Sequence, residues 1–502
     1  MLDESKATRH TTAESIANTF EWIITALILA LTFRAFVLEA FQIPTGSMAD
    51  TLMGDHFRIC CTECGYSYEY NFNPYIQKRY TTPNSAGLYQ LMPSPRCPSC
   101  GYYENPDTLV PISKGDRILV FKCLYQFIEP KRWDVVVFKN PTDPTVNYIK
   151  RLIAKPGETV EIIDGDIYIN GILVRKPAKV QQEMWMCIYN NDYQPIHPME
   201  GRFNNHPWRQ PFTNDKDSQW KYEPARPTEF TLKSPPDSTN IIFYDTHRGN
   251  NFQAVYAYGD PRFYHNIPFC SDLMMNYYAC FESDSGTVGI GLTKYKSLYK
   301  AYLTSSGEMI IEKVDALGQT VELAHKEITP PAADRAFFVR FANVDHQLIF
   351  EIDREKLAYD LGAGKDDAGQ RTSDIEPRAL IFGSGNLTLS HVAIYRDIHY
   401  LDTRPDSRQP VDRAGENNPF TLEKNEYFVM GDNSPDSADS RLWTIEGIGN
   451  NGWQYRMGIV PRDYLVGKAF FVYWPSGFRV NASGLALIPN VGRMRFIYGG
   501  RN

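Results

Sequence analysis

The sequence predicts a mainly β protein with one apolar helix near its N-terminus, and three observations support this fold class. The chain of 502 residues contains 31 tyrosines and 28 phenylalanines, which favour strands. Short apolar runs bounded by turn residues recur along most of its length. A single stretch, near the N-terminus, is apolar enough to be considered for a membrane span. A chain of this length allows two to four domains.

The apolar helix is expected within residues 1–40. The segment from Thr11 to Glu14 has the spacing of a capping box, which begins a helix, and residues 22–33 are uncharged and mostly apolar. This run is shorter than the roughly 20 residues that a membrane span requires. Because the long side chain of Arg34 can extend to the interface, we still predict a cytoplasmic tail followed by a transmembrane helix. A buried core helix is the alternative.

The charges before this helix predict its orientation. Lys6 and Arg9 favour a cytoplasmic N-terminus, which would place everything after residue 40 outside the cytoplasm. No pair of small residues with the spacing of a cleavage site follows the apolar run, so a cleaved signal peptide is not expected. The predicted location is therefore the inner (cytoplasmic) membrane, crossed once.

Changes in composition divide the rest of the chain into a core and two inserts. The core is expected to comprise residues 41–58, 113–178 and 419–485. Residues 59–112 form an insert that contains cysteines and is rich in Tyr, Asn and Pro. Residues 179–418 repeat short strand patterns between turns, which predicts an inserted β-sandwich of the jelly-roll type. Residues 486–502 are interpreted as a C-terminal tail.

Ser47 is the first candidate for catalysis. It lies in the sequence Ile-Pro-Thr-Gly-Ser-Met just after the apolar helix, where a bent segment would hold it near the bilayer. No histidine lies close by to activate it, but Lys150 lies in the apolar run Tyr-Ile-Lys-Arg-Leu-Ile. A lysine can take a proton from serine only if burial lowers its pKa. The two residues suggest a Ser/Lys protease that works at a membrane face.

Several segments resemble the conserved boxes of bacterial type I signal peptidases, in the same order and after a single anchor. The similar segments are residues 45–52 (serine box), 132–138 (strand box), 147–161 (lysine box), 431–441 (last box) and 466–475 (closing segment). The resemblance covers less than half of the chain. It implies a β-rich catalytic core with a nonpolar face toward the membrane.

The resemblance also implies a function and its residues. The chain would be a membrane-bound serine endopeptidase that removes N-terminal signal peptides from secretory preproteins, after small residues at the −1 and −3 positions. Ser47 would be the nucleophile and Lys150 the general base, without a cofactor for catalysis. The backbone N–H of Ser47 and the hydroxyl of Thr45 would form the oxyanion hole.

The last box would support this dyad. Ser437 would orient the lysine amine, and Asp439 would pair with Arg441 to hold the loop. Taken without the resemblance, a loop so rich in Gly, Asp, Asn and Ser is also typical of a self-capped turn. The box departs from the family at Ser434, where an arginine often stands, and this removes one salt bridge of the usual loop.

Two Cys-x-x-Cys-Gly knuckles in the first insert predict a metal site. Cys61, Cys64, Cys97 and Cys100 match a Cys₄ zinc ribbon, although the gap between the knuckles is longer than usual. Disulfides are the alternative, because the predicted compartment is oxidising. Among the other cysteines, Cys270 and Cys280 are expected either to pack in a core or to form one bridge.

Other functional classes are weighed against the peptidase. The net charge of −7 argues against nucleic acid as a partner. A degenerate core could instead tether a binding module, with the sandwich recognising carbohydrate or protein through its aromatic residues. The sandwich weakly resembles a concanavalin-like jelly roll, which establishes no ligand. A self-cleaving repressor is disfavoured by the anchor and by the lack of a DNA-binding helix pair.

Overall fold

A computed structural model describes the chain between residues 12 and 500. It leaves out residues 73–81, 86, 200–201, 204–205, 224–225, 255–266, 372–374, 405–408, 450–451, 453 and 478–487. The predicted tail residues 1–11 and the end of the chain after residue 500 also lie outside the described part. The prediction of a mainly β fold with one N-terminal apolar helix is confirmed.

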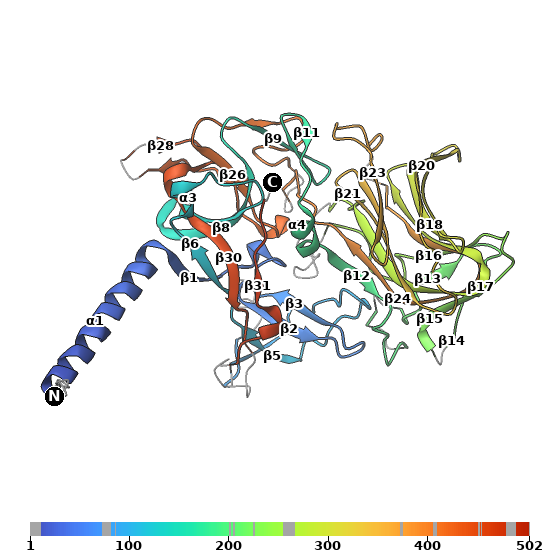
Figure 1. Ribbon diagram of the computed structural model, residues 1–502, viewed down its shortest axis with the longest axis horizontal. Coiled ribbons are helices and arrows are strands. Elements are labelled where there is room, and N and C mark those ends of the chain that lie inside the picture. The colour runs from blue at the N-terminus through green and yellow to red at the C-terminus, as the bar shows by residue number, and fades with distance from the viewer. Residues whose placement is uncertain are drawn as a thin grey trace, which may run out of the picture.

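Helix α1 (Thr12–Phe36) projects from the body of the protein (Figure 1). Its segment Ser15–Phe36 is long and apolar enough to cross a membrane, and none of that window is buried within the protein. The alternative of a buried core helix is therefore wrong. The helix is longer than the apolar run in the sequence because helical residues continue on both sides of it.

The core is built around a sheet of eight strands, which brings together segments far apart in the sequence. Its order is β1 (Leu38–Gln42), β6 (Arg117–Phe121), β30 (Leu465–Trp474), β7 (Val135–Asn140), β8 (Asp143–Ala154), β26 (Glu426–Met430) and β29 (Val460–Pro461), with β31 (Arg495–Phe496) on β30. All of these pairs are antiparallel.

Smaller elements complete the core. A second sheet has the order β11 (Ile172–Leu173), β10 (Asp166–Ile169), β9 (Thr159–Ile163) and β25 (Phe420–Thr421). The short elements are η1 (Gly46–Met48), α3 (Leu124–Phe127), η3 (Ser434–Asp436), β27 (Gly447–Ile448), β28 (Gln454–Tyr455), η4 (Arg462–Tyr464) and η5 (Val491–Arg493). Apolar residues of β9, β10 and β26 pack together beneath the sheets.

The segment interpreted as a C-terminal tail contributes to the core where it is described. Strand β31 pairs with β30, and the neighbouring Ile497 is 5% exposed and packs against Val120 and Val472 of the sheet. The backbone carbonyl of Tyr498 accepts a hydrogen bond from Arg151 at 3.3 Å. Residues 495–498 therefore pack as part of the core.

The cysteine-containing insert forms a small sheet beside the core. Its order is β3 (Ser67–Asn71), β2 (His56–Cys60), β5 (Leu109–Ser113) and β4 (Leu88–Gln90). Its knuckles also contact the second insert, since the side-chain amide of Asn250 donates to the carbonyls of Pro98 and Ile188 at 2.7 and 3.1 Å. This small sheet thus bridges the core and the second insert.

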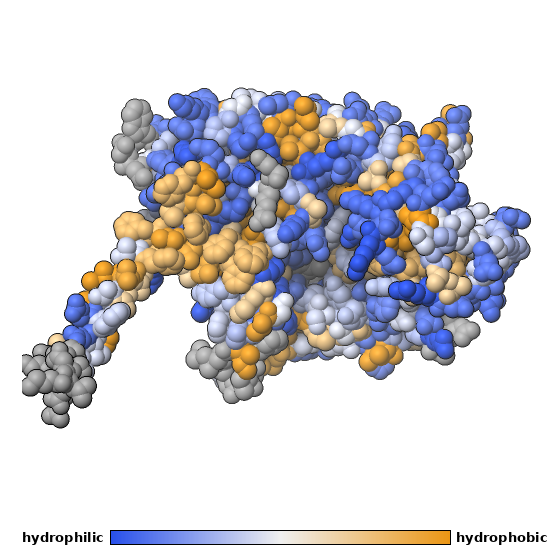
Figure 2. Space-filling model, viewed as in Figure 1, coloured by the Kyte–Doolittle hydropathy of each residue, from blue (hydrophilic) through white to orange (hydrophobic). Residues whose placement is uncertain are grey.

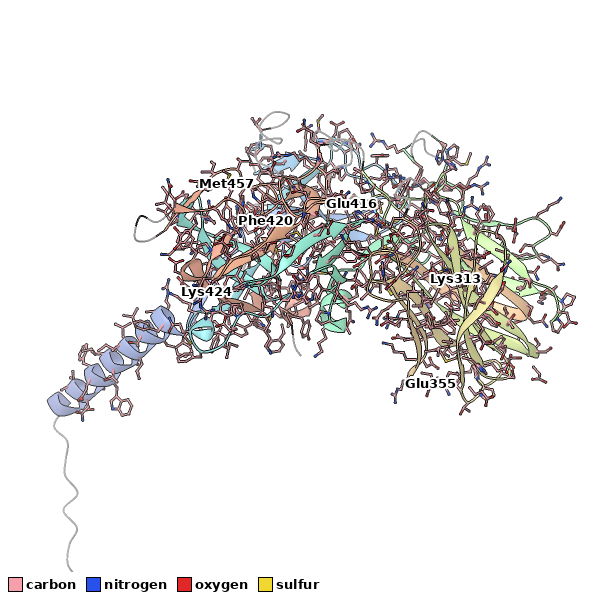
Figure 3. The ribbon with its side chains drawn as sticks, turned by 90° about the horizontal axis from the view of Figure 1, so that it is seen from above. Lys313, Glu355, Glu416, Phe420, Lys424 and Met457 are labelled. Carbon is pink, nitrogen blue, oxygen red and sulfur yellow. The ribbon has the colours of Figure 1, made fainter. Side chains whose placement is uncertain are left out.

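The second insert lies on the side of the core opposite α1 (Figures 1 and 3). Its thirteen strands are β12 (Met186–Asn190), β13 (Phe212–Asn214), β14 (Lys221–Glu223), β15 (Arg226–Lys233), β16 (Asn240–Tyr244), β17 (Leu273–Lys294), β18 (Ser297–Thr304), β19 (Glu308–Val314), β20 (Thr320–Glu327), β21 (Phe337–Val344), β22 (Gln347–Ile352), β23 (Glu355–Asp360) and β24 (Ala379–Arg396). Alternating inward residues of these strands form its own large apolar core.

The junction between core and sandwich is tightly packed. Val180 of helix α4 (Ala178–Glu183) lies in the apolar cluster beneath the core sheets, together with Ile398 and Tyr400 from the chain that returns from the sandwich. A buried ionic network crosses the same junction. Its lysines and acids come from both sides: Lys176 and Asp166 from the core, and Asp272, Lys294, Asp345 and Asp397 from the sandwich.

Candidate active site

The structure brings Ser47 and Lys150 into direct contact across 103 residues of sequence. The Lys150 amine donates to the Ser47 hydroxyl, with 2.5 Å between Nζ and Oγ. Ser47 lies in η1, on the turn that follows β1, and Lys150 lies on the central strand β8. Both are buried, at 8% and 5% exposure. A nucleophile and its base within hydrogen-bond reach form the minimal arrangement for covalent catalysis.

The environment of Lys150 suits a base. Burial lowers its pKa from the ordinary value to about 8, against the opposing charges of Asp439 and Asp432. Burial acts in this direction because a low-dielectric surrounding disfavours the charged ammonium. A substantial fraction of Lys150 is therefore neutral near pH 8 and can accept the proton of a serine hydroxyl.

The loop after β26 is held by a buried ion pair. Arg441 donates twice to Asp439, from Nε at 2.9 Å and from a terminal nitrogen at 2.7 Å. Asp439 also accepts from the backbone N–H of Gly431 at 3.1 Å. The pair predicted from the sequence is thus present in the structure, and its bidentate geometry fixes the direction of both side chains.

Three residues with no assigned role in the sequence analysis tie this loop to the dyad. Arg151 donates two hydrogen bonds to the Asp432 carboxylate, at 2.8 and 2.7 Å. Asn433 donates its backbone N–H to the Ser47 carbonyl at 3.1 Å and its side-chain amide to the Gly46 carbonyl at 3.0 Å. Strand alternation could have indicated Arg151, since it follows Lys150 on β8 and its side chain must leave from the opposite face.

Ser437 lies at the dyad without the predicted hydrogen bond. Its hydroxyl oxygen is buried and has no hydrogen-bond partner among the described residues, while the Lys150 amine donates to Ser47. A Cβ built on Gly431 would lie 2.3 Å from both the Ser437 hydroxyl and the Ser47 carbonyl. The Ser437 hydroxyl therefore lies close to the backbone carbonyl of Ser47, and position 431 has no room for a side chain.

Thr45 and Ser434 complete the set of residues examined. Thr45 precedes η1 in extended conformation, with its side chain exposed next to the nucleophile. Ser434, which stands where the related box often has arginine, accepts hydrogen bonds from Arg441 at 2.6 Å and from the Leu401 backbone at 2.8 Å. The residue that replaces the arginine thus links the loop to the chain returning from the sandwich.

Comparison with known families agrees with this geometry. The family model described as "Signal peptidase, peptidase S26" matches residues 107–212 and 391–474, which include Lys150 and the loop from Gly431 to Arg441.

Over these residues the core is similar to the S26 signal peptidase family.

Similar proteins carry the same description. A signal peptidase I of Rickettsia canadensis is 32% identical over 171 residues, which make up 34% of this chain and 47% of that protein. A signal peptidase I of Rickettsia felis is 31% identical over 168 residues, with the same shares. The chain spans about half the length of the curated relatives it matches. Ser47 lies outside the residues that the S26 family model matches, so its assignment depends on the geometry of the dyad.

Solved structures match part of the chain only at low scores. The carbohydrate-binding module CBM66 from Bacillus subtilis matches 38% of this chain and 99% of that module, with 10% identity and a TM-score of 0.25. Sheep galectin-11 matches 26% of this chain and 94% of that protein, with 9% identity and a TM-score of 0.20. These values assign no ligand to the sandwich.

Beside the core, the four predicted metal ligands converge. The sulfur atoms of Cys61, Cys64, Cys97 and Cys100 all lie within 4.8 Å of one another, and two pairs are 3.8 and 3.7 Å apart. Zn–S bonds of about 2.3 Å in a tetrahedron place the sulfurs about 3.8 Å apart, so the four residues fit zinc. The four cysteines are free, and these separations are far longer than the roughly 2.05 Å of a disulfide.

The second cysteine pair considered in the sequence does not form a bridge. Cys270 and Cys280 are both free. Cys270 is buried and its sulfur lies 3.6 Å from the carbonyls of Asp272 and Asp397, beside the ionic network of the junction. Of the two alternatives, buried packing is the one found for Cys270.

Proposed function

We propose that this protein is a membrane-anchored Ser/Lys endopeptidase that removes N-terminal signal peptides from secretory preproteins. The observation that carries the proposal is the 2.5 Å contact between the Lys150 amine and the Ser47 hydroxyl in a buried site. The S26 match of the surrounding core supports the same reaction. The alternative of a degenerate binding module is not favoured, because the residues required for catalysis are present and in contact.

The proposed reaction begins with proton transfer. Neutral Lys150 takes the proton from the Ser47 hydroxyl as the oxygen attacks the scissile carbonyl. The backbone N–H of Ser47 and the hydroxyl of Thr45 stabilise the oxyanion. The Lys150 ammonium then gives its proton to the leaving amine, and an acyl-enzyme on Ser47 remains. Lys150 next activates a water molecule that hydrolyses this ester.

The surrounding loop keeps the dyad in register. Asn433 fixes the carbonyls of Gly46 and Ser47, and the ion pairs of Asp432 and Asp439 fix the loop that carries Asn433. The Ser437 hydroxyl would accept a hydrogen bond from the charged Lys150 ammonium and donate one to the neutral Lys150 amine. Positions held this rigidly lower the cost of reaching the reactive geometry.

The remaining parts of the proposal concern location and specificity. Helix α1 would anchor the protein once in the inner membrane, with the core on the extracytoplasmic side. Substrates would be cut after small residues at −1 and −3, as the family resemblance implies. Zinc at the four cysteines would be structural, with no role in the chemical step. The sandwich would contact whole precursors or another ligand, outside the dyad.

A cleavage assay tests the proposal. The full chain, reconstituted in membranes, is incubated with a precursor that carries a signal peptide, and the new N-terminus is sequenced. Cleavage after a small residue is expected, and a Ser47→Ala protein prepared in the same way should produce none. Equal product from both proteins would exclude the dyad as the catalyst.

A further inference from the structure

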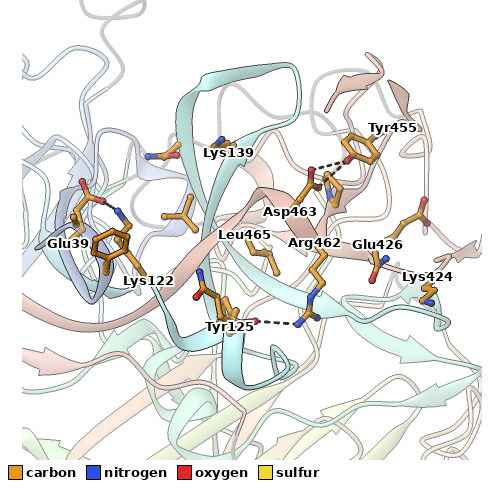
Figure 4. Close-up of a pocket in the computed structure, with 17 residues that line it drawn as sticks. Glu39, Lys122, Tyr125, Lys139, Lys424, Glu426, Tyr455, Arg462, Asp463 and Leu465 are labelled. Atoms are coloured by element: carbon orange, nitrogen blue, oxygen red, sulfur yellow. Dashed lines mark hydrogen bonds and ion pairs between the residues drawn. The ribbon is translucent and has the colours of Figure 1, made fainter. Parts of the chain in front are cut away.

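A groove of about 1180 Å³ opens beside the end of α1 (Figure 4). It runs from Glu39 and Lys122, near the helix, to Lys424 and Glu426 of the core. Phe36, the last residue of α1, is part of its wall. Neither Ser47 nor Lys150 lines this groove, so the proposed peptide chemistry does not account for it.

The charges in the groove favour an anion. Its three acidic side chains all have partners: Glu39 pairs with Lys122 at 3.0 Å, Glu426 with Arg456, and Asp463 accepts from the Tyr455 hydroxyl at 3.0 Å. Lysines also line it at positions 139 and 424. Lys424 is exposed and has no hydrogen bond or ion pair with any residue that the structure describes. Asp463 keeps its negative charge, because the Tyr455 hydroxyl is neutral. Four basic side chains line the groove against three acidic ones, so the lining carries a net positive charge.

Apolar side chains surround this basic groove. Phe36 is 69% exposed, and Phe127 and Ile128 of the α3 segment are 80% and 46% exposed. Figure 2 shows a hydrophobic area at the base of α1 that continues onto the neighbouring surface of the core. Figure 3 shows Lys424 near the same end of the helix.

The position of the groove selects its occupant. The apolar segment Ser15–Phe36 ends at the groove, so a bilayer crossed by α1 would have its headgroups at this level. Exposed aromatic residues and lysines are the side chains that anchor proteins in that interface. The negative charge of a phosphate can pair with the ammonium of Lys424. The acyl chains of the same lipid can contact Phe36 and Phe127.

We propose that this groove binds the headgroup of an anionic phospholipid from the membrane that α1 crosses. Lys424 and Lys139 supply positive charge for the phosphate, Lys122 lies beside them in its pair with Glu39, and Phe36 and Phe127 border the acyl chains. The bound lipid fixes the core against the bilayer at a defined height. This inference rests on the proposed membrane anchoring, but it does not depend on the proposed cleavage.

Native mass spectrometry of the full chain in detergent tests the site. The protein is mixed with equal amounts of phosphatidylglycerol and phosphatidylcholine, and the lipids retained after release from the micelle are counted. We expect preferential retention of phosphatidylglycerol. The triple variant K122Q/K139Q/K424Q should lose at least tenfold of this preference, since each lysine near an anionic lipid contributes about fivefold.

A matched variant controls for net charge. K216Q/K233Q/K356Q removes three exposed lysines from the sandwich and should keep the wild-type lipid preference. Cleavage of a soluble peptide should be equal in all three proteins, so a failed peptidase assignment would be recognised separately. Equal retention of the two lipids by the wild type, or an unchanged preference in the groove variant, would overturn the proposal.

Discussion

Lysines are buried in two regions of this molecule, and the two regions treat them in opposite ways. At the dyad, Lys150 contacts a neutral hydroxyl, and burial lowers its pKa to about 8. At the junction, Lys176 is equally enclosed, with a side chain that is 4% exposed. Burial again opposes its charge, but the carboxylates of Asp345 and Asp397 raise its pKa well above the ordinary value.

The comparison shows that partners, more than burial, decide what a buried lysine does. A lysine beside a hydroxyl is available as a base, whereas a lysine between carboxylates stays charged and joins two parts of the chain. Lys294 repeats the second pattern with Asp272 and Asp166. We therefore expect chemistry to depend on Lys150 and stability to depend on Lys176 and Lys294.

The largest expected effect is on cleavage. Lys150→Met and Ser47→Ala should each lower kcat/KM by about 10⁴-fold or more, because a dyad acts as a unit. Lys150→Arg should be equally inactive, since a guanidinium keeps its proton. The midpoint of urea unfolding should be unchanged or higher for Lys150→Met, because a costly buried amine is removed. A large loss of stability in Lys150→Met would contradict the expectation that Lys150 serves the chemistry and not the stability of the fold.

The reverse result is expected at the junction. Lys176→Met leaves Asp345 and Asp397 without their shared cation, which should lower the free energy of unfolding by about 3–5 kcal/mol. The folded fraction should still cleave a short peptide with unchanged kcat/KM. Lys365→Met is the control, because its ion pair with Glu161 is more than a third exposed on the lysine side and should contribute less than about 1 kcal/mol.

The four-cysteine cluster would bury charge in a third way, because a zinc ion would neutralise the thiolates that bind it. We expect one zinc per chain by elemental analysis of protein purified without chelator. Cys64→Ser should lose the metal and lower the melting temperature, whereas Cys60→Ser, at the exposed neighbouring position, should do neither. Protein without zinc, in which these four thiols cannot be titrated, would contain disulfides instead.

The smallest expected effect is on the pH dependence of cleavage, which reports the pKa of Lys150. The cleavage rate should rise as pH increases through about 8, because the neutral form of Lys150 is the base. The carboxylate of Asp436, held by Asn71 of the cysteine-containing insert at 2.8 Å, contributes to keeping the pKa of Lys150 up. Asp436→Asn should therefore move the rise to lower pH by a few tenths of a unit. A shift to higher pH would contradict this sign.

Much of the dyad region could be predicted from the sequence, because its residues lie in short segments with recognisable composition. Ser47, Lys150 and the pair of Asp439 and Arg441 are all brought together in one site. The hydrogen bond between Ser437 and Lys150 is absent among the described contacts, since a serine rotor and an amine can each choose among several neighbours. Local sequence does not specify that choice.

The junction could not be predicted, because its residues share no local pattern. Asp166, Lys176, Asp272 and Asp397 are isolated charges in four different segments, and each would be read as a solvated residue. Only the side-chain contacts between β10 and the ends of the sandwich strands bring them together. Separating the sandwich from the core would expose this buried network to solvent.

The C-terminal strand has a consequence for the order in which this protein can become active. Arg495 donates to the carbonyl of Thr51, 444 residues earlier, and Tyr498 accepts from Arg151 beside the dyad. The segment that carries the nucleophile is thus braced by residues synthesised long after it. A partly made chain that ends before Arg495 lacks that brace, so the site remains incomplete until residues 495–498 have been synthesised and have packed against it.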